Sequence, residues 1–214
     1  MPRRPKPTPA TVVLFVRHGT TATTGKVLPG RARGLHLADT GKAQADGVAE
    51  RLAALKKVDA IYASPLERTR ETAAPIGRRL GLPVVSEKGL LECDFGDWTG
   101  AELKELSRKP EWGTVQRYPS GFRFPNGESF KEMHLRVTDT VARLRARHPG
   151  QTVVAVSHAD PIKAAVADAS GTPLDLFQRI VISPCSVSAV AYGDGGPMVL
   201  TVNSLGDLAE LRPS

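Results

Sequence analysis

Two short apolar runs determine which architectures are open to this sequence. TVVLFV at residues 11–16 and QTVVAVS at 151–157 are rich in β-branched residues. Neither run alternates regularly between apolar and polar residues, as a strand with one solvated face would. Such runs are typical of strands that helices cover on both faces. They therefore predict two strands of a buried sheet.

Further strands alternate with segments of helical periodicity. Strands are predicted at residues 60–63, 83–85, 186–192 and 198–203. Helices are predicted at residues 39–57, 65–80, 128–147 and 161–169. Pro75 is expected to kink or split the second of these helices. The alternation predicts an α/β fold: a three-layer α/β/α sandwich with a mostly parallel central sheet.

The length of 214 residues suits one domain between two tails. We expect residues 1–10 to be a disordered basic tail, 11–205 a single domain and 206–214 a C-terminal tail. Residues 90–127 lack a regular period and predict an irregular insertion that covers the substrate, with one short helix near 101–107. The basic N-terminus lacks the apolar core of a signal peptide, and no apolar run is long enough to span a bilayer. We therefore expect a cytoplasmic protein without a membrane partner.

Charge and cysteine content narrow the choice of partners. The net charge is +7, of which the basic tail supplies three, leaving +4 on the domain. This excess fits an anionic small-molecule substrate and is too small to indicate nucleic acid. Cys93 and Cys185 do not form a C-x-x-C pair, and we expect both to be buried, reduced thiols.

Charged and nucleophilic residues follow three of the predicted strands. Arg17 and His18 end the first strand, Arg68 lies one turn after the second, and His158 ends the run at 151–157. Ligands of open α/β sheets bind beyond the carboxyl ends of the strands. The sequence therefore predicts that two histidines and two arginines meet at one edge of the sheet.

The glycine loop after His18 does not match a nucleotide-binding P-loop. That motif needs four residues between its glycines and a hydroxyl residue after its lysine. Here five residues separate Gly19 from Gly25, and Val27 follows Lys26. A nucleoside triphosphatase is therefore not expected, and Gly19 is assigned to a tight turn after the strand.

The same residue types suit phosphoryl transfer. The reaction spreads negative charge over three oxygens, and the planar guanidinium of arginine matches phosphate oxygens. A neutral imidazole with one free nitrogen can attack phosphorus. An alkoxide leaving group needs a proton, which a carboxyl group of raised pKa can donate. Glu92 lies among apolar residues in the sequence and is the candidate for that acid.

Five motifs occur in one order between residues 14 and 160, in a resemblance that extends from about residue 12 to 203: LFVRHGTT, SPLERTRETA, LLECDFGDWTG, FPNGES and VVAVSHAD. Together they resemble the histidine phosphatase superfamily, also called the phosphoglycerate mutase-like family. The likeness is to its phosphatase branch, and especially to a bacterial subgroup labelled probable phosphomutases. The resemblance implies a phosphoglycerate mutase-like fold. It also implies a phosphomonoesterase that acts on a small phosphorylated metabolite through a phosphohistidine intermediate, with neither metal nor cofactor.

The resemblance also assigns roles to residues. His18 would be the nucleophile that becomes phosphorylated, and Arg17, Arg68 and His158 would bind the phosphoryl group. Glu92 would be the proton donor, and it would later accept a proton from the attacking water.

Two further residues are expected to bind substrate. The backbone N–H of Ala159 would add a donor to the phosphate, although glycine is frequent at this position in the family. Thr24 stands where many members have asparagine, and its hydroxyl can still donate to a phosphate oxygen. Thr20 replaces an acidic residue that is common after Arg-His-Gly. These departures affect the fit of the substrate more than the core reaction.

Two alternatives remain open at this stage. A phosphomutase would share every catalytic residue, but ECDFGDW around Glu92 is more similar to the phosphatases than to the glycolytic mutases. A non-catalytic phosphate-binding regulator would have lost a catalytic residue, whereas all five positions are filled here. Many relatives are dimers, so a homodimer is also considered.

The other charged and aromatic residues are given structural interpretations. Glu128 is expected at a helix N-terminus, where its charge favours the helix dipole. Trp98 and Trp112 are candidates for either the core or a pocket wall. The arginines of the helix at 128–147 are expected on a solvated face: Arg136, Arg143, Arg145 and Arg147.

Overall fold

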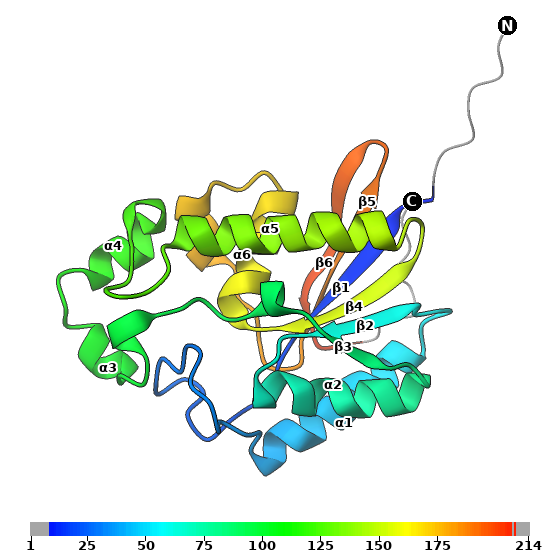
Figure 1. The fold of residues 1–214 in the computed structure, drawn as a ribbon, viewed down its shortest axis with the longest axis horizontal. Helices are drawn as coiled ribbons and strands as arrows, with labels where there is room; N and C mark the ends of the chain where they lie inside the picture. The colour runs from blue at the N-terminus through cyan, green and yellow to red at the C-terminus, as the bar shows by residue number, and fades with distance from the viewer. Residues whose placement is uncertain (1–8, 207, 209–214) are drawn as a thin grey trace, which may run out of the picture.

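The computed structural model describes residues 9–206 and residue 208, so most of both predicted tails lies outside the described residues. Six strands form one sheet in the order β3-β2-β4-β1-β5-β6 (Figure 1). They are β1 (Thr11–Arg17), β2 (Ala60–Ala63), β3 (Val84–Ser86), β4 (Thr152–Ser157), β5 (Val187–Gly193) and β6 (Gly196–Ser204). The pairs from β3 to β1 are parallel, and β5 is antiparallel to both of its neighbours. The predicted mostly parallel sheet is confirmed.

Helices cover both faces of this sheet. Those described are α1 (Asp39–Ala53), α2 (Glu67–Leu80), α3 (Leu103–Leu106), α4 (Trp112–Arg117), α5 (Phe130–Arg147) and α6 (Ala159–Ala169). Figure 1 shows α1 and α2 on one side of the sheet and α5 and α6 on the other. The three-layer α/β/α prediction is therefore confirmed. No helix among the described residues has both the length and the apolarity needed to cross a membrane.

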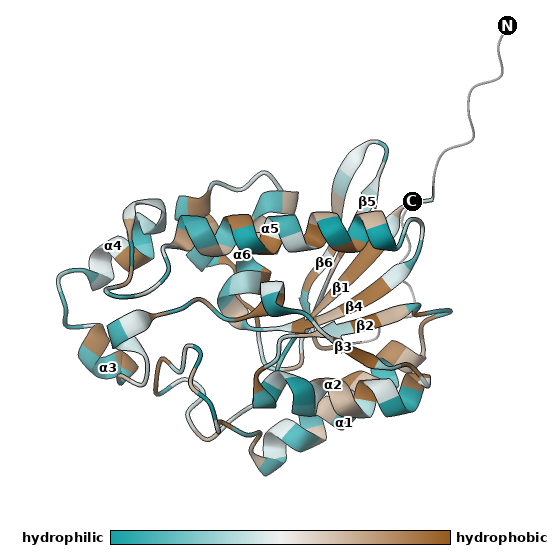
Figure 2. Cartoon of the chain, in the orientation of Figure 1, coloured by the Kyte–Doolittle hydropathy of each residue, from teal (hydrophilic) through white to brown (hydrophobic). Residues whose placement is uncertain are grey.

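The central strands bury alternate side chains in two separate cores. Val13 and Phe15 of β1 join the core beneath α5 and α6, whereas Leu14 and Val16 join the core beneath α1 and α2. None of the four is more than 1% exposed. Figure 2 shows hydrophobic colour concentrated on the strands between the helical layers. The absence of strict alternation in the sequence of β1 is thus explained by burial on both faces.

Several boundaries differ from the sequence predictions. Helix α1 ends at Ala53 rather than at residue 57, and α6 begins at Ala159, two residues before Pro161. Helix α2 continues through Pro75, so the predicted split is not found. Ala73 and Ile76 are fully buried on either side of the proline, and we attribute the continuity of the helix to this packing against the core.

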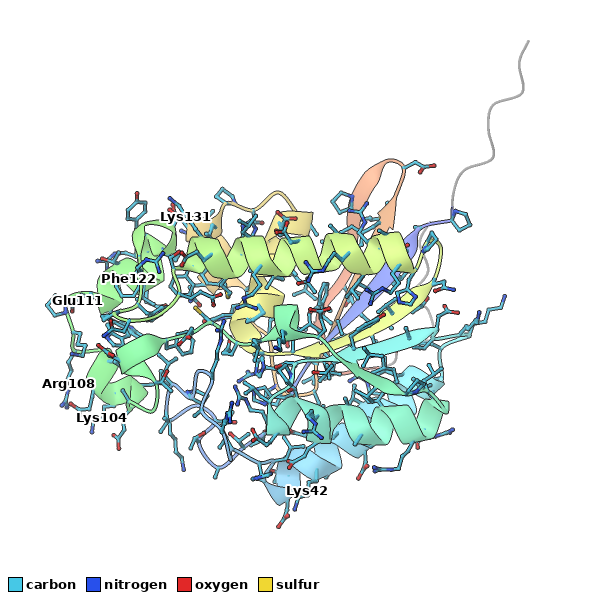
Figure 3. All side chains as sticks on the ribbon, in the orientation of Figure 1. Lys42, Lys104, Arg108, Glu111, Phe122 and Lys131 are labelled. Carbon is cyan, nitrogen blue, oxygen red and sulfur yellow. The ribbon has the colours of Figure 1, made fainter. Side chains whose placement is uncertain are left out.

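The irregular insertion is more structured than predicted. It contains two short α-helices, α3 and α4, where one was expected. Single 3₁₀ turns at Gly96–Trp98 and Pro119–Gly121 connect the rest of the segment. Figure 1 shows α3 and α4 at the end of the molecule toward which β1 runs. The α3 helix is short, and its Lys104, together with the following Arg108, is exposed at the outer surface (Figure 3).

Helix α5 begins at Phe130, two residues later than predicted. Its N-cap is Ser129, whose hydroxyl accepts from the Glu132 backbone N–H, while the Glu132 carboxylate accepts from the Ser129 N–H. This reciprocal capping box satisfies two backbone donors. Glu128 lies directly before this N-cap, so its predicted place at a helix N-terminus is confirmed, and its carboxylate has further partners described below.

Candidate active site

The carboxyl ends of β1, β4 and β2 bring the predicted histidines and arginines together. These strands are neighbours in the sheet, and β1 and β2 each continue their hydrogen bonding to β4 one residue beyond their ends. The His18 N–H donates to the Ser157 carbonyl at 3.0 Å, and the Ser64 N–H donates to the Val156 carbonyl at 3.0 Å. The rings of His18 and His158 meet edge to face, with centroids 5.2 Å apart. The predicted meeting at one sheet edge is what the structure shows.

His18 is held as a neutral imidazole with one free nitrogen. Its Nδ1 lies 2.8 Å from the Gly19 carbonyl oxygen. A carbonyl only accepts, so Nδ1 carries the hydrogen and Nε2 keeps its lone pair. The side chain is buried, and this burial together with the charges of Arg68 and Arg17 lowers the pKa of His18 to about 3. The imidazole is therefore unprotonated at neutral pH, as a nucleophile must be.

Two arginines present unpaired donors beside His18. Arg68 has no exposed surface, and one of its amino groups donates to the Gly30 carbonyl at 2.7 Å. Arg17 donates to the Ile182 carbonyl at 2.6 Å. Arg17 Nε, Arg68 Nε and a second Arg68 amino nitrogen are buried without a partner among the described residues. Burial lowers the pKa of both guanidiniums from the usual range.

His158 adds a further unpaired atom. Its Nε2 lies 2.8 Å from the Ser64 hydroxyl oxygen, whereas its Nδ1 is buried without a partner among the described residues. Burial and the nearby charge of Arg68 lower the pKa of His158, so its ring is also neutral. His158 is the N-cap of α6, and Ala159 is the first residue of that helix. The N–H groups at a helix start have no partner within the helix and favour anions.

Glu92 lies in the same pocket with its carboxyl group buried. One of its oxygens accepts from the Cys93 N–H at 3.0 Å. Burial and the negative charge of Asp160 raise the pKa of Glu92 to about 7. A carboxyl group with this pKa is about half protonated at pH 7 and mostly protonated below it, so it suits a proton donor. Cys93 and Cys185 are free and buried, as predicted.

Four of these residues line a cavity of about 440 Å³, and Arg68 and His158 are not among its lining residues. Arg17, His18, Glu92 and Ala159 line it. The insertion and the loop after β1 contribute most of the apolar wall, including Leu28, Phe95, Leu103, Trp112, Val115 and Phe124. The two segments are joined, because the Leu28 N–H donates to the Ala101 carbonyl at 2.9 Å. The insertion therefore covers the carboxyl ends of the strands.

The structure places Thr24 and the two tryptophans at or behind the cavity wall. Thr24 lines the cavity, but its hydroxyl accepts from the Thr21 N–H at 2.9 Å and so also shapes the loop. Trp112 lines the cavity, whereas Trp98 is 6% exposed and stacks behind it. The alternatives of core and pocket wall are thus divided between the two tryptophans.

Sequence reasoning missed a polar group in the cavity wall. Lys163 Nζ lies 3.2 Å from a carboxylate oxygen of Asp160 and 2.8 Å from the Gln178 side-chain oxygen. All three residues line the cavity. The available signal was the i, i+3 spacing of Asp160 and Lys163 on the helix that follows His158.

It also missed a group of ion pairs behind Glu92. Glu128 accepts from Arg31 at 3.0 Å and from Arg136 at 2.8 and 2.9 Å. The side chain of Arg136 is 21% exposed, so its assignment to a solvated face is wrong. Its charge is compensated by Glu128, and one of its amino groups donates to the carbonyls of Gly89 and Leu91. Helical periodicity places Arg136 beside solvated positions, and its acidic partner lies eight residues away.

The site contains the parts of an anion-binding reaction centre. Buried donors without a protein partner call for an explanation, and here they surround one neutral imidazole. Guanidinium groups and a helix N-terminus are donors that suit a phosphate. The arrangement can hold a phosphoryl group against His18 Nε2 and supply a proton from Glu92.

Known proteins share this sequence pattern. The family model of the histidine phosphatase superfamily (branch 1) matches residues 13–205. Phosphoserine phosphatase 1 of Hydrogenobacter thermophilus is 32% identical over 194 residues, covering 85% of this chain and 88% of that protein. The bifunctional protein Rv2228c of Mycobacterium tuberculosis is 33% identical over 206 residues, covering 92% of this chain and 55% of its own length. This chain thus spans about half of that protein.

Solved structures share the fold. Bacillus stearothermophilus YhfR superimposes with a TM-score of 0.82 at 26% identity, covering 95% of this chain and all of that chain. The family match extends over nearly the whole sheet and includes both histidines, both arginines and Glu92. This chain belongs to the histidine phosphatase superfamily, branch 1, and is a phosphatase.

Proposed function

We propose that this chain hydrolyses small phosphorylated metabolites, without a metal ion, through a phosphohistidine formed at His18. One observation carries the proposal. The neutral His18 ring has a free Nε2 and lies among buried donors of Arg17, Arg68 and His158 that lack protein partners. A tetrahedral phosphoryl group accepts hydrogen bonds on several oxygens while its phosphorus faces one nucleophile.

In the first step, His18 Nε2 attacks phosphorus and the bond from phosphorus to the leaving oxygen breaks with its electron pair. Glu92, protonated below its pKa of about 7, donates its proton to that oxygen. The two guanidiniums, the His158 ring and the N-terminus of α6 hold the phosphoryl oxygens. The positive charge of the guanidiniums and the dipole of the helix N-terminus compensate the charge that develops on these oxygens, and the neutral His158 ring contributes a hydrogen bond.

In the second step, water attacks the phosphorus of phosphohistidine. The Glu92 carboxylate accepts a proton from that water. The bond from phosphorus to Nε2 breaks, and its electron pair returns to the imidazole. Phosphate then leaves, and Glu92 is again protonated. The side chains thus supply the positive charge and the proton transfer that a metal site would otherwise provide.

The substrate is expected to be a small phosphomonoester. The cavity of about 440 Å³ is within the range of small-molecule sites. Its walls are mainly apolar, with Lys163, Asp160 and Gln178 as polar contacts for the part of the substrate beyond the phosphate. The relative from Hydrogenobacter thermophilus is named a phosphoserine phosphatase, so phosphoserine belongs in the first substrate panel.

We further propose that the protein acts in the cytoplasm, where free thiols such as Cys93 and Cys185 stay reduced. The proposed partner is the phosphorylated substrate, with neither nucleic acid nor membrane involved. A homodimer is the proposed assembly, and size-exclusion chromatography with light scattering would measure it.

The test is steady-state phosphate release from a panel of phosphomonoesters in the presence of EDTA. Wild type is compared with His18→Ala and, as a control, with His134→Ala, a histidine of α5 that pairs with Asp168 and does not line the cavity. We expect activity that resists EDTA, is retained in the control and is lost in His18→Ala. Rapid alkaline quenching of the wild type should trap a phosphoryl group on His18. Release that persists in His18→Ala would refute the mechanism.

A further inference from the structure

We propose that Arg31 is a positioning residue that fixes the proton donor Glu92 relative to the phosphate-binding Arg68. The proposal rests on the proposed function. Gly30 and Arg31 are adjacent in one turn. Gly30 holds Arg68, and Arg31 holds Glu92. The Gly30 carbonyl accepts from Arg68 at 2.7 Å, and Arg31 Nε donates to the Glu92 carbonyl at 2.9 Å.

Glu92 depends on side-chain contacts for its position. Residues 91–95 belong to neither a helix nor a strand, so no regular ladder of backbone hydrogen bonds orients them. Arg136 reaches the Leu91 carbonyl at 2.9 Å and the Glu92 carbonyl at a longer 3.4 Å. Arg31 provides the shorter contact to Glu92 and also pairs with the Asp94 carboxylate at 3.4 Å. The backbone of the proton donor is therefore held mainly by two arginines.

Glu128 keeps these two arginines in place. It accepts from both of them and from the Asp94 N–H at 3.1 Å. The Glu128 side chain is 15% exposed and that of Arg31 is 30% exposed, so water weakens their pairing less than at an open surface. Arg136 lowers the pKa of Glu128, which stays ionised. Both arginine charges are thus compensated without the Glu92 carboxyl group.

The turn that carries Arg31 has little freedom. Gly30 has φ of +50°, and a Cβ at this position would lie 2.8 Å from the Thr99 hydroxyl and 3.2 Å from the Phe95 ring. A side chain is therefore excluded at Gly30 by both its conformation and its neighbours. Pro29, just before it, lines the cavity. The Arg31 side chain thus starts from a fixed point beside the substrate.

This arrangement makes Arg31 matter for proton transfer in particular. A general acid must come within hydrogen-bond distance of the leaving oxygen, and a displacement of about 1 Å can cost roughly 100-fold in rate. Arg31 does not line the cavity, so its removal leaves the phosphate donors present. The expected loss therefore depends on how much the leaving group needs a proton.

The experiment compares Arg31→Met with Arg33→Met, an exposed position in the same loop. The readout is kcat/KM, which covers the steps up to departure of the leaving group, for an alkyl phosphate and for p-nitrophenyl phosphate in EDTA. For Arg31→Met we expect a loss of about 100-fold with the alkyl ester and less than about 3-fold with the aryl ester. Inhibition by inorganic phosphate should stay unchanged. Arg33→Met should match the wild type.

Equal losses with both esters, or no loss, would overturn the positioning role. Arg31→Lys is the second variant, for use if Arg31→Met does not fold. It keeps the charge but not the fork of donors, and it should show the same selective loss to a smaller extent. A wild type whose activity does not need His18 would refute the proposed function instead, and with it this role of Arg31.

Discussion

The Nδ1 atom of His18 and the carbonyl oxygen of Gly19 are joined by a hydrogen bond of 2.8 Å between adjacent residues. The backbone itself thus selects the tautomer of the proposed nucleophile. Gly19 is fixed in turn, because its N–H donates to the Thr72 hydroxyl at 3.0 Å. The orientation of the ring therefore depends on the path of the chain immediately after β1.

Gly19→Ala tests this dependence. A Cβ at Gly19 would lie 2.5 Å from the Gly41 carbonyl oxygen, a backbone atom that cannot move aside alone. The carbonyl that holds His18 must shift, and we expect a loss in kcat/KM of about 100-fold or more. Gly47→Ala on α1 is the control, since a Cβ there meets nothing within 4 Å. It should keep full activity and stabilise the fold by about 0.5–1 kcal/mol.

The pH dependence of the reaction should report Glu92. The acid is active when protonated, and its pKa is raised to about 7 by burial and Asp160. With an alkyl phosphate, kcat/KM should fall as pH rises through about 7. Glu92→Gln should lower kcat/KM by about 100- to 10,000-fold and abolish this basic limb. A wild-type profile that stays flat from pH 6 to 9 would contradict the role of Glu92.

Asp160→Asn should shift the pH at which kcat/KM falls on the basic side of the profile. The negative charge of Asp160 raises the pKa of Glu92, so its removal should lower this pKa and shift the limb to lower pH. Asp168→Asn is the control. Asp168 lies on the same helix but pairs with His134 and does not line the cavity. A limb that does not move in Asp160→Asn, measured with the same alkyl ester, would show that Asp160 does not tune the proton donor.

The sheet and the reacting residues could be predicted because their signals are local. Unbroken β-branched runs indicated strands buried on both faces, and parallel strands place their carboxyl ends together. His18 and His158 were therefore assigned to one edge from their positions after two such runs, and their rings meet there. Glu92 lies in a segment with no regular period; its apolar neighbours in the sequence make it the candidate acid, and the family motifs assign it the same role.

The support of the site could not be predicted in the same way. From the sequence of their own segment, Arg136 is assigned to a solvated face and Glu128 to the helix dipole. A charged side chain is buried only where an opposite charge meets it, and the local sequence does not show that partner. For Glu128 one such partner is Arg31, which lies 97 residues away in the sequence. The Lys163 contact with Gln178 is also decided by folding, since Gln178 lies in a separate 3₁₀ helix.

Through Arg68, the binding of phosphate should raise the stability of the folded protein. Its guanidinium is wholly buried, two of its nitrogens lack a partner among the described residues, and burial lowers its pKa. The charged form is therefore disfavoured until an anion binds, so inorganic phosphate should raise the free energy of unfolding. A one-site ligand at 100 times its Kd contributes about 2.7 kcal/mol.

Arg68→Met should remove this coupling while keeping the fold. Replacing a buried, incompletely paired charge by an apolar side chain of similar length is often neutral or stabilising. The loss of its hydrogen bond to Gly30 limits any gain. We expect the Tm of Arg68→Met without phosphate to stay near that of wild type and to show no rise when phosphate is added. Arg70→Met, exposed on the same helix, should respond to phosphate as wild type does. If Arg68→Met kept the full phosphate-dependent rise in Tm, Arg68 would not be a phosphate ligand, and the anion would have to be held by Arg17, His158 and the N-terminus of α6 alone.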